Sequence, residues 1–63
     1  MITVKELFDF VVKEKGVTLT PLQEVEFIKG CENAIADHNF VEDQKISARL
    51  YLMEILRHPQ ILI

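Results

Sequence analysis

Large apolar residues recur at helical spacing in three segments of the chain. The first segment carries one apolar face, made by Val4, Leu7, Phe8 and Val11, with Phe10 and Val12 at its edges. Thr3 precedes this face and Glu6 follows Thr3 by three residues, a spacing typical of a capping box. Gly16 readily takes the left-handed conformation that ends many helices. The pattern therefore predicts a helix over about residues 3–15.

The second segment opens on the sequence TPLQ, in which Thr20 caps a helix, Pro21 occupies its first position and Gln23 completes a capping box. Two neighbouring apolar stripes follow, one made by Leu22, Val25, Ile28 and Ile35 and the other by Phe27, Cys31, Ala34 and His38. Gly30 either costs about 1 kcal/mol relative to alanine or allows another helix to approach closely. We expect this helix to span about residues 21–38.

The third predicted helix, over about residues 40–57, carries apolar residues on two nearly opposite sides. It starts either at Asn39, paired with Glu42, or at the later Asp43, and Pro59 prevents its continuation. At about 100° per residue, one side holds Val41, Ala48, Leu52 and Ile55, and the other side holds Ile46, Leu50 and Met53. A helix that is apolar nearly all round is typically a buried one.

These segments predict a single all-α domain over residues 1–63, built as a small three-helix bundle or as a helical hairpin with an additional N-terminal helix. Two partner helices cover one side of the third helix well but not both. Either the apolar tail, residues 59–63, folds back over the second side, or that side is an interface with another chain. We favour the interface, and a fold completed by oligomerisation, because so short a chain has little else to use as a cover.

The composition indicates a folded protein of a reducing compartment. Apolar types make up 49% of the 63 residues, which is too much for a disordered chain. Cys31 is the only cysteine, so no disulfide framework supports the fold, and small scaffolds of this kind rely on packed helices or on oligomerisation. No segment approaches the ~18 apolar residues of a membrane span, and the N-terminus does not resemble a signal peptide. We expect a cytoplasmic protein without a membrane anchor, of the kind common among small accessory proteins of bacteria and their phages.

The sequence offers no pattern of residues for catalysis. Cys31 and His38 are seven residues apart, about 10 Å along a helix, too far to bind one metal ion or to form a thiolate pair directly. Glu54 and His58 are one helical turn apart, but such pairs are too common to indicate a general base. Motifs for phosphate, zinc or calcium binding are absent from the 63 residues. We expect neither an enzyme nor a cofactor or metal site.

The favoured function is a small protein-interaction or regulatory module. It would associate with itself, as a homodimer or higher oligomer, or dock on an unidentified protein through the third helix and the tail. The expected contact residues are Ile46, Leu50, Met53, Tyr51, Arg57, Ile61 and Leu62.

Two other classes of function stay open. The first is a small-ligand binder whose pocket forms between subunits. The second is a helix-turn-helix DNA-binding protein, since three helices in about 60 residues suit that module and Lys45 and Arg49 lie on one side of the third helix. A net charge of −3 and the apolar character of that helix weigh against nucleic acid.

Overall fold

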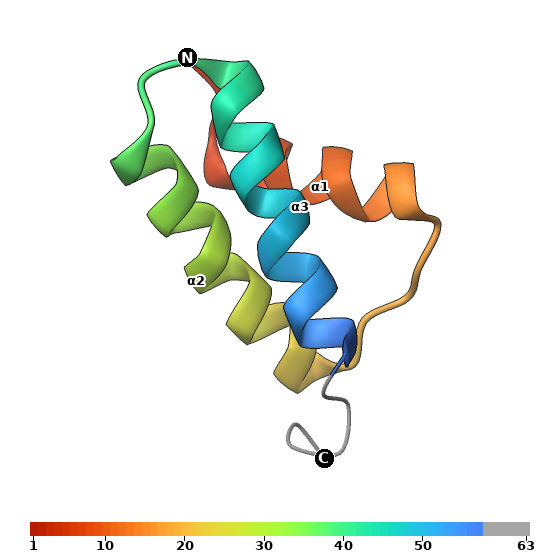
Figure 1. Ribbon diagram of the computed structural model, residues 1–63. Helices are drawn as coiled ribbons and strands as arrows, with labels where there is room; N and C mark the ends of the chain where they lie inside the picture. Colours follow the sequence, from red (N-terminus) through yellow and green to blue (C-terminus); the bar gives the residue numbers. More distant parts are fainter. Residues whose placement is uncertain (58–63) are drawn as a thin grey trace.

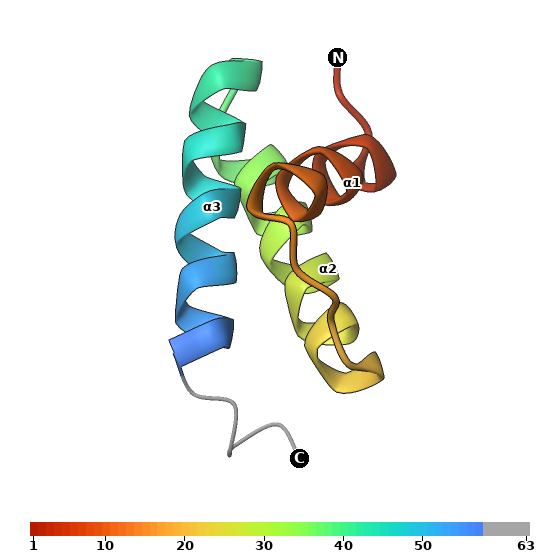
Figure 2. The same cartoon turned by 90° about the vertical axis from the view of Figure 1, so that its right-hand side faces the viewer.

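The computed structural model describes residues 1–57 and contains three helices, α1 (Val4–Lys15), α2 (Pro21–Asp37) and α3 (Val41–Arg57). The helices α2 and α3 form an antiparallel hairpin, and α1 runs across one face of that hairpin (Figures 1 and 2). The prediction of a small all-α three-helix bundle is therefore confirmed for the described part of the chain. Each helix end lies within one residue of its predicted position. Completion of the fold by oligomerisation stays a prediction.

The first two helices begin with the capping boxes that the sequence predicts. The Thr3 hydroxyl accepts from the Glu6 backbone N–H at 3.1 Å, and the Glu6 carboxylate accepts from the Thr3 N–H at 2.9 Å. Thr20 and Gln23 repeat this exchange at 3.2 and 2.9 Å. Gly16 ends α1 in the left-handed conformation, with φ of 67°. Each of these contacts joins residues that are close together in the sequence, so each forms in the folded protein as the sequence predicts.

The start of α3 differs from both predicted alternatives. The carbonyl of Phe40 accepts the first helical hydrogen bond, from the Gln44 N–H at 3.0 Å, so neither Asn39 nor Asp43 occupies the capping position. The Gln44 side chain is buried and donates from Nε2 to the His38 carbonyl at 2.7 Å. This bond ties the end of α2 to the first turn of α3 and stabilises the tight turn between them.

The core lies where the three helices meet. Among residues 1–57, seven side chains of this core are fully buried, Leu7, Val11, Phe27, Cys31, Ala34, Ala48 and Leu52. Of the two stripes on α2, the one that contains Phe27 therefore faces the core, and the rings of Phe8 and Phe27 pack with centroids 5.2 Å apart. The other stripe is largely exposed, because α1 and α3 together cover only one side of α2.

The helices α2 and α3 approach each other closely at Gly30. A β-carbon at this position would lie 2.8 Å from Cγ and 2.9 Å from Cβ of Tyr51. These distances are shorter than real contacts between carbon atoms allow, so the hairpin packs as closely as it does because Gly30 has no side chain. Of the two roles that the sequence leaves open for Gly30, close helix packing is the one the structure shows.

Candidate interaction surfaces

The outer face of α3 carries three of the predicted contact residues. Ile46, Leu50 and Met53 are 53%, 59% and 43% exposed. They lie on the side of α3 opposite Ala48 and Leu52, because residues seven or four apart share a face while residues two apart do not. We call Ile46, Leu50 and Met53 the α3 outer face. It is a contiguous apolar strip on a helix whose other side already fills the core.

The other predicted contact residues occupy different places. Tyr51 is half-buried at the seam between α2 and α3, against Gly30, and it shares a shallow hollow of about 290 Å³ with Ser47, Leu50 and Glu54. Arg57 is exposed at the end of α3, with Nη1 3.3 Å from the Glu54 carboxylate. Ile61 and Leu62 lie outside the described residues. The structure thus gathers Ile46, Leu50 and Met53 on one face and sets Tyr51 beside them.

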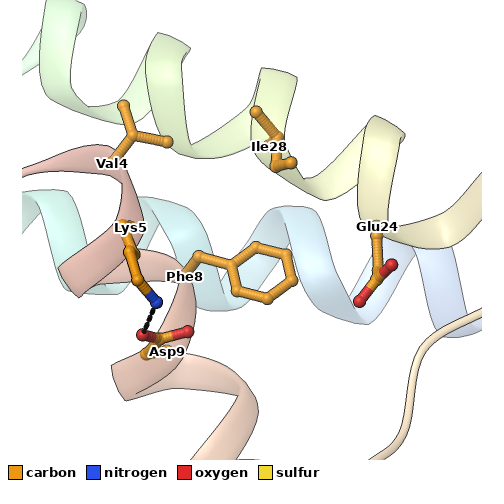
Figure 3. Close-up of a pocket in the computed structure, with 6 residues that line it drawn as sticks. All are labelled: Val4, Lys5, Phe8, Asp9, Glu24 and Ile28. Carbon is orange, nitrogen blue, oxygen red and sulfur yellow. Dashed lines mark hydrogen bonds and ion pairs between the residues drawn. The ribbon is translucent and has the colours of Figure 1, made fainter. Parts of the chain in front are cut away.

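A second apolar surface lies between α1 and α2, and the sequence did not predict it. Here Val4, Phe8 and Ile28 line an open hollow of about 440 Å³ (Figure 3). Its rim carries Glu24 and the ion pair between Lys5 and Asp9, whose atoms are 2.9 Å apart. The signal was present in the two apolar stripes of α2, since a bundle of three helices buries only one of them. Exposed Leu22 and Val25 extend the apolar surface along α2.

The basic residues of α3 make contacts within the fold. Arg49 donates two hydrogen bonds to the carboxylate of Glu14 on α1, at 2.7 and 3.1 Å. This pairing lowers the pKa of Glu14 and raises that of Arg49. Lys45 lies over the ring of Phe10, with Nζ 4.2 Å from the centroid. Both cations on which the DNA-binding interpretation relied therefore hold α1 against α3.

Cys31 is fully buried in the core. Burial raises the pKa of its thiol to about 12, and the nearby carboxylate of Glu32 adds to the shift. Because the thiolate is the reactive form, the thiol stays protonated and inert at neutral pH. Cys31 thus contributes to packing, which is how small buried cysteines usually act.

Among the helices of residues 1–57, none is both long enough and apolar enough to cross a lipid bilayer. Comparison of the chain with protein-family models, with curated proteins and with solved structures finds no match in any of the three. Function must therefore be inferred from the surfaces themselves.

Proposed function

We propose that this protein is a small non-enzymatic interaction module that associates with itself through the α3 outer face. The observation that supports the proposal is the exposure of Ile46, Leu50 and Met53 on one strip of a helix whose opposite side is already buried. A contiguous exposed apolar strip of this kind is typical of an interaction site. Two copies of the same strip can bury each other about a two-fold axis, the commonest closed arrangement of identical chains.

The size of the strip sets the expected strength of association. Complete burial of one large aliphatic side chain contributes about 1.5–3 kcal/mol, and each of the three is about half exposed. Six side chains in a dimer would then contribute roughly 5–9 kcal/mol, against an association cost of at least about 4 kcal/mol. A micromolar complex needs about 8 kcal/mol net. At most about 5 kcal/mol remains, which corresponds to a dissociation constant no tighter than about 0.2 mM. We therefore expect a weak, concentration-dependent dimer.

Light scattering behind size-exclusion chromatography, over a wide range of loading concentrations, tests the proposal. We expect the mean mass to rise from monomer towards dimer, and Leu50→Asp to abolish the rise without loss of helicity. Leu22→Asp is a matched control, because Leu22 is 51% exposed on α2 and the substitution is the same. Equal behaviour of the two variants, or a wild-type chain that stays monomeric at concentrations above about 1 mM, would contradict the proposal.

A further inference from the structure

The α3 outer face is bounded by two opposite charges at equal distances from its centre. Leu50 is the middle residue of the strip, Asp43 precedes it by seven residues and Arg57 follows it by seven. Seven residues are almost two helical turns, so Asp43, Leu50 and Arg57 point to nearly the same side of α3. Asp43 and Arg57 are both exposed. Each charge lies about 10 Å from Leu50 along the helix axis, at the 1.5 Å rise of an α-helix.

We infer that the occupant of the α3 outer face is a second copy of α3 in antiparallel orientation, centred on Leu50, with Asp43 of each copy facing Arg57 of the other. This inference rests on the proposed self-association. A two-fold axis at Leu50 brings together residues that share a side of α3 and lie at about equal distances before and after Leu50. Ile46, four residues before Leu50, then lies beside Met53, three residues after it. The apolar residues pair with each other in the middle, and the charges pair at both ends.

The opposite orientation is disfavoured by the same charges. In a parallel pair, Asp43 would face Asp43 and Arg57 would face Arg57, so both ends of the contact would repel. Like charges set against each other across an interface select against that arrangement. The antiparallel pair converts both repulsions into attractions without changing the apolar contact.

The intramolecular partner of Arg57 does not prevent this contact. Its ion pair with Glu54 is 3.3 Å long, and both side chains are about 60% exposed. Exposed pairs on a helix surface are weak, and a guanidinium has five donors. Arg57 can therefore bind a carboxylate of a second copy while it stays close to Glu54.

Charge reversal at the two ends tests the orientation. The Asp43→Arg variant alone would set two guanidinium groups against each other at both ends, and the Arg57→Glu variant alone would set two carboxylates against each other. We expect each variant to dimerise about tenfold more weakly than wild type at low salt, from two exposed contacts that change from attraction to repulsion. The double variant, and an equimolar mixture of the two single variants, should recover wild-type association. Added salt should reduce all these differences.

Cysteine cross-linking gives an independent measure, because native Cys31 is buried and inert. Leu50→Cys should form an intermolecular disulfide readily, since the two-fold axis brings its two copies together. Asp43→Cys should not, because its two copies would lie about 20 Å apart, well beyond the separation of roughly 7 Å that a disulfide tolerates.

Different outcomes would contradict the antiparallel orientation and the proposed self-association. Single charge variants that dimerise like wild type, or efficient cross-linking of Asp43→Cys, would overturn the antiparallel arrangement. If Leu50→Asp still abolishes association in that case, the proposed self-association stands. A wild-type chain without any association would overturn both.

Discussion

Helix propensity and the packing of α2 against α3 predict opposite effects of Gly30→Ala on the stability of the protein. From helix propensity, Gly30→Ala in the interior of α2 should stabilise the protein by about 1 kcal/mol. The structure implies the opposite sign, since the new β-carbon would lie 2.8 and 2.9 Å from two atoms of Tyr51. One of these atoms is the Tyr51 β-carbon, which is fixed to the backbone and cannot rotate away. To relieve the contact, α2 and α3 must move apart.

Overpacking of this kind typically costs about 1–3 kcal/mol. With the gain in propensity of about 1 kcal/mol subtracted, we expect Gly30→Ala to lower the free energy of unfolding by up to about 2 kcal/mol. In a domain of this size, 1 kcal/mol corresponds to roughly 4–8 °C in the melting temperature. The expected result is therefore a decrease of up to about 15 °C.

Thermal unfolding followed by far-ultraviolet circular dichroism measures this decrease, with urea unfolding as a second measurement of the free energy. Tyr51→Ala removes Cγ but keeps Cβ, so Gly30→Ala should cost less in that background and still be unfavourable. An increase in melting temperature for Gly30→Ala would refute the close packing of α2 against α3. An unchanged cost in the Tyr51→Ala background would show that Cγ of Tyr51 adds nothing to the obstacle.

The remaining predictions concern two titratable groups, Cys31 and Glu14. Burial raises the pKa of the Cys31 thiol in the folded protein to about 12, so the unfolded chain loses this proton first as pH rises. The free energy of unfolding should therefore fall between about pH 9 and pH 12, by up to about 1.4 kcal/mol per pH unit. Urea unfolding of Cys31→Ala should show a smaller fall. The same thiol should react with Ellman's reagent only as the protein unfolds, and rapid labelling of the native protein would contradict its burial. Arg49 lowers the pKa of Glu14, so this pair stabilises the fold at neutral pH and the contribution is lost as pH falls below about 4.5. Glu14→Gln should therefore destabilise the protein at neutral pH more than Asp9→Asn does in its more exposed pair, and the difference should shrink in acid. Equal effects at neutral pH would show that the pair of Glu14 and Arg49 contributes no more than the exposed pair of Lys5 and Asp9.

The features predicted correctly are those encoded within a few consecutive residues. The box of Thr3 and Glu6, the box of Thr20 and Gln23, and the left-handed Gly16 each satisfy backbone groups at one helix end. Nothing that happens elsewhere in the fold changes those contacts. Both ends of α1 and the start of α2 follow directly from them.

The features missed depend on contacts between distant residues. Glu14 and Arg49 are 35 positions apart, and no local pattern distinguishes Arg49 from a solvated cation. In the sequence, Gln44 resembles any other polar helix residue. Its hydrogen-bond partner is the backbone carbonyl of His38, and a backbone group cannot be recognised from the residue type. The sequence showed that α2 has two apolar stripes, but which of them is buried depends on where α1 crosses the hairpin.

Packing of the core accounts for the apolar residues on only one side of α3. Its inner side uses Ala48 and Leu52, and Gly30 on α2 lets the two helices approach closely enough for such residues to close the core. Large apolar side chains on the opposite side add nothing to that packing, and a solvated helix face is normally charged or polar. Within the described residues 1–57, Ile46, Leu50 and Met53 therefore have no role in packing that glutamate, lysine or glutamine would not serve as well. The proposed second copy of α3 would give these three residues a role, and it would also account for the opposite charges of Asp43 and Arg57 at the two ends of the strip.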